Sequence, residues 1–414
     1  MITKVKINKA TLLEFVFIQV LIFSPMASIL GNLLPSIGKI KFSWVYWIIV
    51  LFLGLLILIK YKVGRKYLGV ILFFIFFSTI FSKSFDLKTF INVINSLNIL
   101  FVSYILIKKD FFNKNVIKIL FYGFVLQFAI ILVISLGQLE GAIPLSLSAS
   151  GYVNATHLDD GSVVKRLNGF FYHPFDLSIF FYFSLMTIFY MVSKKSKYVI
   201  LFFLLFIMFI VRIKMGFVLS ILVFLFYFLF IDKRYRKIKF VSSVFVLFFG
   251  AYIIFKYMPK EQLSYFNINL SFPYFDPQFL TGRGSIWNIY FKGIQEYFGL
   301  MDYIFGYGFD THDLFTKSMT PEHWYPLRSG TSYIPAPHNL LLQLFVLGGL
   351  LLISFFILIT VKFYKIITRS AFLVLLFLPV LAYGITASIM DINFFWAMVS
   401  IALFFTHKFS KYQI

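Results

Sequence analysis

The sequence predicts an all-α, polytopic membrane protein with about twelve transmembrane helices. Hydrophobic residues make up 60% of the 414 residues, whereas charged residues make up only 13%. Soluble globular domains have roughly 25% charged residues, and no soluble core needs so much apolar surface. The charges that are present fall in short clusters between long apolar runs, which is the pattern of membrane spans joined by loops.

Apolar runs of about 17–25 residues are long enough to cross a bilayer as helices. The third run is short, and only Arg212 and Lys214 separate the seventh run from the eighth. In chain order, the predicted spans are 12–31, 43–59, 67–81, 89–107, 116–137, 174–193, 198–213, 215–231, 240–257, 338–360, 371–388 and 392–406.

The distribution of charge predicts which loops face the cytoplasm. The two termini and every second connection carry 24 of the 38 Lys and Arg residues, but only two of the 16 acidic residues. Basic loops stay on the cytoplasmic side of a membrane. We therefore expect both termini in the cytoplasm and a multi-pass location in an inner (plasma) membrane.

Two longer segments, 138–173 and 258–337, are predicted external loops of a single transmembrane domain that takes in residues 1–414. The larger loop contains seven acidic residues together with Pro, Gly and aromatic residues. It has no polar low-complexity stretch of the kind that stays disordered. We therefore expect it to form an ordered cap.

The composition argues against several classes of function. The net charge of +22 is not gathered on a soluble face, so we expect no binding of nucleic acid. The chain has no Cys, and the spacing of its His, Asp and Glu residues matches no standard metal site. Since no phosphate-binding loop or zinc motif is present, we expect neither a metal nor another cofactor.

Four polar clusters lie at the predicted outer loops and are candidates for binding and catalysis. Arginine and glycine backbone can hold phosphate oxygens, and histidine can exchange a proton near neutral pH. A helix start or a plain turn explains the first three clusters about as well. In chain order, the clusters are Arg166 with His173, Arg212 with Lys214, Arg283 with Trp287, Gly306 and Gly308, and His338 with Asn339.

The order of these residues resembles the O-antigen polymerase and O-antigen ligase family of polysaccharide-assembly membrane proteins. The family pattern is Arg-x-x-Gly-x-Phe, then Gly-Arg followed by Trp, then Gly-x-Gly, and then His-Asn with a glycine pair in the next helix. This chain departs from the pattern at Lys214-Met-Gly216, where the family commonly has Ser-Arg-Gly, and at Pro174-Phe175, where Pro-Asn is usual. The matching residues are Arg166, Gly169, Phe171, Gly282, Arg283, Trp287, Gly306, Gly308, His338, Asn339, Gly348 and Gly349.

The resemblance implies a bacterial, metal-independent glycosyltransferase with a GT-C-like architecture that polymerises repeat units of O-antigen or capsule on the outer face of the membrane. A polyprenyl-pyrophosphate-linked oligosaccharide would be both donor and acceptor, and a chain-length regulator protein would be a further partner. The resemblance implies His338 and Arg283 as catalytic residues. The substrate-binding residues that it implies are Arg166, Arg212, Lys214, His173, Asn339 and Trp287.

Two alternatives stay open. An O-antigen ligase uses the same donor but transfers the glycan to lipid A core, and so contributes to lipopolysaccharide. A transporter or flippase of lipid-linked sugars has a similar number of helices, but usually carries polar or charged residues at mid-membrane and broken helices. The middle positions of the predicted spans are almost uncharged, so the polymerase is favoured.

The charge pattern makes a topological prediction. Because the native chain has no Cys, a single engineered cysteine reports its own side of the membrane. A cysteine at Ser318 should react with a membrane-impermeant maleimide in intact spheroplasts. Reaction only after lysis would place the loop 258–337 in the cytoplasm and contradict the assignment.

Overall fold

The computed structural model is almost entirely helical across the residues that it describes. The one exception is a short antiparallel pair of strands, β1 (Ala155–His157) and β2 (Val163–Lys165), within the predicted loop 138–173. The described residues are 11–33, 42–139, 155–157, 163–165, 171, 174–192, 194–211, 214–231, 279–318, 337–367, 379–380, 383–384, 389–390 and 392–412.

Among the described residues, five helices are long and apolar enough to cross a membrane, namely α2, α3, α4, α5 and α14. The protein is therefore suited to a lipid bilayer. The helices are α1 (Leu12–Leu33), α2 (Phe42–Lys60), α3 (Lys62–Phe81), α4 (Leu87–Lys108), α5 (Lys114–Leu139), α6 (Pro174–Met191), α7 (Lys194–Val211), α8 (Lys214–Phe226) with a π-helical continuation at Tyr227–Ile231, α11 (Phe279–Tyr297), α12 (Leu300–Phe305), α13 (Thr311–Ser318), α14 (Leu340–Ile367) and α16 (Asn393–Tyr412).

Ten of the predicted spans coincide with a described helix, while the total of about twelve stays a prediction. The predicted span 240–257 lies outside the described residues, and 371–388 is described only at 379–380 and 383–384. The third helix is longer than the predicted span 67–81. Helix α3 begins at Lys62 and so includes the basic residues that precede the apolar run. Lysine and arginine favour helices, and their stems can cover apolar surface near a membrane boundary.

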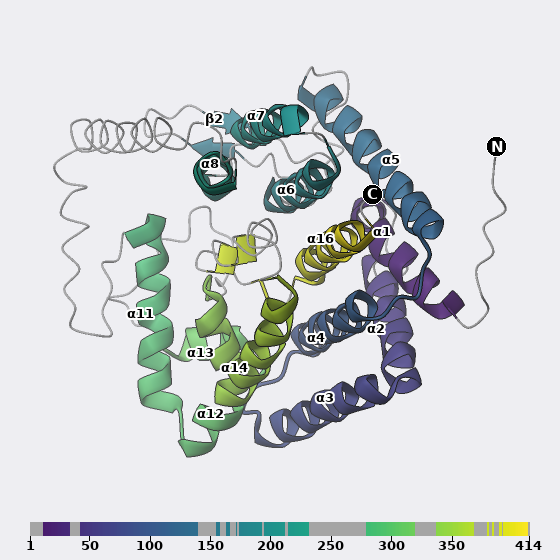
Figure 1. Cartoon of the computed structure of the whole chain (residues 1–414). Coiled ribbons are helices and arrows are strands. Elements are labelled where there is room, and N and C mark those ends of the chain that lie inside the picture. The colour runs from purple at the N-terminus through teal and green to yellow at the C-terminus, as the bar shows by residue number, and fades with distance from the viewer. Residues whose placement is uncertain are drawn as a thin grey trace.

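Helix α4 forms the centre of the first half of the bundle, where it contacts α2, α3 and α16 (Figure 1). Its polar side chains bind the neighbouring helices. The amide of Asn95 donates to the carbonyl of Trp47, and that of Asn98 donates to the carbonyl of Leu51. Gly54 of α2 leaves the space that the Asn98 side chain fills. Small residues and amides are common where helices pack closely in lipid.

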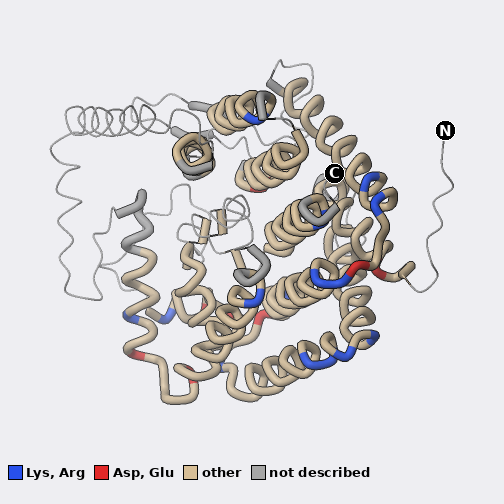
Figure 2. The backbone as a smooth tube through the Cα atoms, viewed as in Figure 1, with Lys and Arg blue, Asp and Glu red and all other residues tan. Residues whose placement is uncertain are grey.

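One end of the bundle is held by ion pairs between helix ends, and one partner of each pair is buried. Glu14 is fully buried and accepts hydrogen bonds from Lys60 at 2.7 Å and from Tyr61 at 2.5 Å. Lys408 is also buried, and it contacts Asp110 and the carbonyl of Lys109. We call this the basic end. It brings together the start of α1, the end of α16 and two connections that the charge pattern assigns to the cytoplasm, and Figure 2 shows most described charges near helix ends.

At the other end, helices α11, α12 and α13 form the cap, which lies within the predicted loop 258–337. The cap has a hydrophobic core of its own, shared with the first turns of α14. This second core consists of Ile286, Trp287, Ile289, Tyr290, Ile294, Tyr307, Leu314, Phe315, Leu342 and Val346. The cap is joined to the turn between α3 and α4, where Phe309 donates its backbone N–H to the carbonyl of Ser84.

The span predicted at 338–360 coincides with α14, but α14 is divided by a sharp kink that the sequence did not predict. Gly348 and Gly349 have non-helical dihedrals, and Gly349 has a φ of +57° and a ψ of −153°. The carbonyl of Val346, which a straight helix would bond four residues ahead, instead accepts the N–H groups of Tyr307 and Gly308. Figure 1 shows the resulting V, formed by a first arm (340–347) and a second arm (350–367), with its point beside α12.

Ser318 is a poor site for cysteine labelling, because its side chain is buried. Ser318 is buried against Gly293, and its hydroxyl donates to the carbonyl of Leu314. A cysteine there would be shielded from reagent in either topology. Thr316 is exposed on the same helix and is therefore the proper site for the maleimide.

The kink predicts that Gly349→Ala destabilises the protein. A positive φ combined with an extended ψ is adopted almost only by glycine, and another residue held there costs ~1–3 kcal/mol. The added Cβ would also lie 2.6 Å from the backbone of Ile304. We expect a lower melting temperature for the purified protein, measured by tryptophan fluorescence or size-exclusion survival.

A matched control is Gly69→Ala in α3, where a Cβ meets no atom within 4 Å. Alanine stabilises a helix interior by ~0.5–1 kcal/mol relative to glycine, so this variant should melt at or above the wild-type temperature. Equal melting temperatures for the two variants would contradict the kinked geometry.

Candidate functional site

The structure describes the side chains of three of the predicted site residues, Trp287, His338 and Asn339, and it brings these three together. The indole N–H of buried Trp287 donates to the carbonyl of Pro337 at 2.9 Å. This bond ties α11 to the residue that immediately precedes His338, across 50 positions of sequence. Trp287 therefore positions the chain that carries His338 and Asn339.

The other predicted site residues are described in part or not at all. Arg283 lies in α11 one turn before Trp287, so the two positions share one face of that helix. Lys214 is the first residue of α8. For both residues the structure describes only the place in the helix. The remaining three predicted residues, Arg166, His173 and Arg212, lie outside the described residues.

His338 has an unusual backbone conformation, with a φ of 49°. Among the described residues it alone combines a side chain other than hydrogen with a positive φ. This region is sparsely populated by residues other than glycine, although His is among those enriched there. The side chain is half-buried. Strained residues that the surrounding structure holds in place gather at functional sites, so this outlier supports a functional role for His338.

Asn339 has a structural role that sequence reasoning did not assign. Its side-chain oxygen accepts the N–H of Leu342 at 3.1 Å, which makes Asn339 the N-cap of α14. That oxygen is therefore engaged in starting the helix. If Asn339 binds a substrate as predicted, it would do so through its side-chain NH₂ group. Asn339 also lines the cavity described below.

The glycines at 306 and 308 are explained by packing rather than by phosphate binding. The N–H groups of Tyr307 and Gly308 donate to the carbonyl of Val346, and the N–H of Phe309 is also bonded within the protein. These donors are thus not directed at a ligand. Glycine is required because a Cβ at Gly306 would lie 2.4 Å from the nitrogen of Gly348, and one at Gly308 would lie 2.2 Å from the carbonyl oxygen of Ser84.

A segment that the sequence did not single out links the starts of three helices. The hydroxyl groups of Tyr383 and Ser178 lie 3.0 Å apart, which joins Tyr383 to the first turns of α6. Gly216, near the start of α8, packs against the same two side chains. Gly384 packs against Leu340 at the start of α14. The apolar run 371–388 contains no motif that would have revealed this junction.

An apolar cavity of about 210 Å³ adjoins the start of α14. It lies between α4, the two arms of α14, α16 and the junction segment, with Asn339 and Thr360 as its polar lining residues. The apolar lining is Leu100, Leu340, Leu341, Phe356, Ile359, Phe363, Val380, Gly384, Trp396, Val399 and Leu403. A cavity of this composition suits a hydrocarbon chain rather than a sugar.

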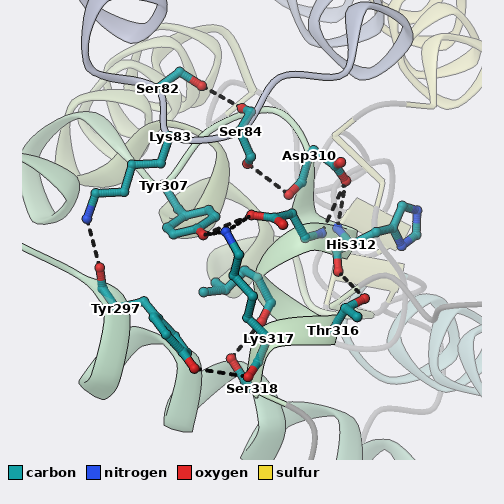
Figure 3. Close-up of polar contacts among 12 residues, drawn as sticks. Ser82, Lys83, Ser84, Tyr297, Tyr307, Asp310, His312, Thr316, Lys317 and Ser318 are labelled. Atoms are coloured by element: carbon teal, nitrogen blue, oxygen red, sulfur yellow. Dashed lines mark hydrogen bonds and ion pairs between the residues drawn. The ribbon is translucent and has the colours of Figure 1, made fainter.

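A network of ion pairs and hydrogen bonds stabilises the cap (Figure 3). Lys317 contacts both Asp313 at 2.7 Å and the hydroxyl of Tyr307 at 3.1 Å, and Tyr307 also donates to Asp313. Burial raises the pKa of Tyr307; Lys317 opposes this effect and Asp313 adds to it. The pKa of exposed Lys317 is raised above its ordinary value, chiefly by its bond to Asp313.

Asp310 completes the network by accepting the N–H groups of His312 and Asp313, which starts α13. The network therefore stabilises the fold of the cap. Within the part of the chain that the structure describes, no group of three His, Cys, Asp or Glu side chains could hold a metal ion.

Comparison of the chain with protein-family models, with curated proteins and with solved structures finds no match.

The backbone of His338 predicts opposite effects of two substitutions on stability. Glycine adopts a φ of 49° without steric cost, so His338→Gly should melt at or above the wild-type temperature. Valine is β-branched and tolerates this region poorly, so His338→Val should melt lower. Thermal unfolding of the two purified variants measures the difference. A valine variant as stable as the glycine variant would contradict the strained conformation.

Proposed function

We propose that this protein is a metal-independent membrane glycosyltransferase of the bacterial inner membrane that polymerises lipid-linked oligosaccharide repeat units. One observation carries the proposal: Trp287 of α11 holds the strained His338 segment at the start of α14, although 50 residues separate them in sequence. Two of the elements on which the resemblance to the O-antigen polymerase and ligase family rests, Trp287 and the His338-Asn339 pair, therefore lie next to each other.

The electrostatics of this region favour a diphosphate. The junction at Tyr383 and Gly384 brings together the first turns of α6, α8 and α14, and helix starts carry partial positive charge. Lys214 begins α8, and His173 directly precedes α6 in the sequence. With Arg166, Arg212 and Arg283 added from the sequence, cations would surround the leaving diphosphate.

In the proposed reaction, a sugar hydroxyl of the acceptor repeat unit attacks the anomeric carbon of the donor glycan. The bond between that carbon and the phosphate oxygen breaks, and polyprenyl pyrophosphate leaves with the electron pair. The neutral imidazole of His338 takes the proton of the hydroxyl, since histidine ordinarily titrates near neutral pH. Arg283 would stabilise the charge on the diphosphate, because guanidinium presents paired donors to phosphate oxygens.

The hydrocarbon part of such a substrate also has a suitable neighbour. The apolar cavity lies directly beside Asn339, so a lipid tail and a polar headgroup could be held on the two sides of the start of α14. This arrangement is typical of sites that bind an amphipathic ligand with a few oriented polar groups. Donor and acceptor would both be polyprenyl-pyrophosphate-linked, and a chain-length regulator protein is a further proposed partner.

The ligase alternative shares this donor and differs only in its acceptor, so the same geometry supports it. A transporter is less favoured. The buried amides of α4 donate to neighbouring backbone carbonyls, and Asn393 of α16 joins Asn92 to Ser96. These polar groups hold the helices together, which accounts for them without a transport path.

The proposal predicts that His338→Gln abolishes elongation. Glutamine keeps hydrogen-bonding capacity but cannot accept a proton at neutral pH, and removing a general base costs roughly 10²–10⁴-fold in rate. The assay supplies a purified lipid-linked repeat unit to the reconstituted protein and resolves the product ladder. A rate above about a tenth of the wild type would exclude the base role.

Two further variants make the experiment specific. His312→Gln changes an exposed histidine of the cap whose backbone makes the hydrogen bonds to Asp310 and Thr316, so it should elongate normally. Arg283→Lys keeps the charge but loses the paired donors, so its ladder should be lost while the protein still folds. Transfer to lipid A core in place of a ladder would identify a ligase, and no transfer by wild-type protein to either acceptor would refute the proposal.

A further inference from the structure

We propose that helix α12 of the cap lies in the lipid of the membrane leaflet at the cap end, as an interfacial anchor that holds the cap at a fixed height. The occupant of its exposed face is the acyl-chain region of that leaflet. This inference does not depend on the proposed function.

The exposed face of α12 is entirely apolar or aromatic. Leu300 is 76% exposed, and Met301, Tyr303 and Ile304 are each about 40–50% exposed. A short external helix in water would not normally present four large apolar side chains within six residues. Contiguous apolar exposure of this kind marks a contact with lipid or protein.

The polar groups of α12 face the protein rather than the exposed side. Asp302 is only 2% exposed, and its carboxylate accepts the N–H of Gly299 at 2.6 Å and the ammonium group of Lys83 at 2.5 Å. Lys83 also donates to the carbonyl of Tyr297 (Figure 3), and about half of its side chain is exposed. The helix thus has an apolar face and a polar side, which is the pattern of helices that lie in a membrane interface.

Helix α12 lies beside the last turns of α3, which is one of the predicted spans. The ring of Phe305 stacks on the rings of Phe77 and Phe81, at centroid distances of 5.3 and 4.6 Å. These two residues lie in the last two turns of α3, a helix long and apolar enough to cross the membrane. Phe76 and Ile80, which are nearly 60% exposed in the same turns, continue the apolar surface. The face of α12 is therefore continuous with surface that lipid must cover.

Groups suited to the headgroup region lie on or beside α12. Lys83 can extend from this level toward water, as lysines near membrane boundaries do. Tyr297 and Tyr303 are partly exposed, and tyrosines are enriched at the membrane interface. An apolar face flanked by lysine and tyrosine matches the change from acyl chains to headgroups across a membrane boundary. This match indicates lipid, rather than a second protein, as the partner of the exposed face of α12.

The anchor would also fix the position of α14. Gly306, which ends α12, packs on Gly348, and Ile304 packs on Gly349 at the point of the V. A helix held in the leaflet would therefore hold both arms of α14, and with them His338, at a constant depth.

The test uses two single-cysteine variants, Met301→Cys on α12 and Thr316→Cys on α13, each carrying a nitroxide spin label in a lipid nanodisc. Both native side chains are exposed, so neither label disturbs packing. Power saturation compares collisions of the label with oxygen, which concentrates in lipid, and with a water-soluble nickel chelate. We expect a several-fold higher ratio of oxygen to nickel accessibility at 301 than at 316.

Two outcomes would overturn the proposal. Equal ratios at the two sites would place α12 in water. Exclusion of both relaxing agents at 301 would show that protein covers the helix, either a second copy of this chain or another partner. Comparable melting temperatures of the labelled variants and the wild type would verify that the fold is retained.

Discussion

The close packing of Gly306 against Gly348 and Gly349, and of Gly308 against Ser84, is the constraint on which the rest of the structure depends. Gly306 and Gly308 come so close to the backbone of Gly348 and Ser84 that any Cβ would overlap with main-chain atoms. Only bare backbone allows this approach. The contact fixes three parts of the molecule at once: the point of the V in α14, the end of α12 and the turn between α3 and α4. The cap has no other comparably tight attachment among the described residues.

This contact also solves the problem that a broken helix creates in a membrane. A backbone carbonyl or N–H without a partner is costly in lipid, so irregular backbone survives there only where protein supplies the missing bonds. The carbonyl of Val346 loses its helical partner at the kink and gains the N–H groups of Tyr307 and Gly308. The kink and the cap are therefore interdependent, since each satisfies the backbone groups of the other.

The V determines the surroundings of His338. If α14 were straight, its first residues would lie roughly 35 Å from Phe363, given a rise of 1.5 Å per residue. The observed cavity instead has Leu340 and Phe363 in the same lining. Folding the helix back thus brings the strained His338 segment over an apolar cavity and next to the junction at Tyr383. The bond from Trp287 to Pro337 then holds the segment from the cap side.

The sequence by itself determined the ten described helices that coincide with predicted spans, and it determined the basic end. Helix formation in lipid follows from local composition, because each apolar run must satisfy its own backbone, and the basic clusters mark helix ends for the same local reason. Helix α3 begins at Lys62, before the predicted start at residue 67. The basic residues in between are not apolar, but they favour a helix, so a prediction from hydropathy alone omits them.

Only the tertiary structure decided how the pieces meet. The run 338–360 is uniformly apolar, so its fold-back depended on Gly349 adopting a φ of +57° against Ile304, a partner distant in sequence. The roles of the glycines as packing sites, of Asn339 as a helix cap and of Tyr383 as a junction all arise from contacts between remote segments. Residue patterns record which groups are present, whereas long-range contacts decide which hydrogen-bond donors are already engaged within the protein.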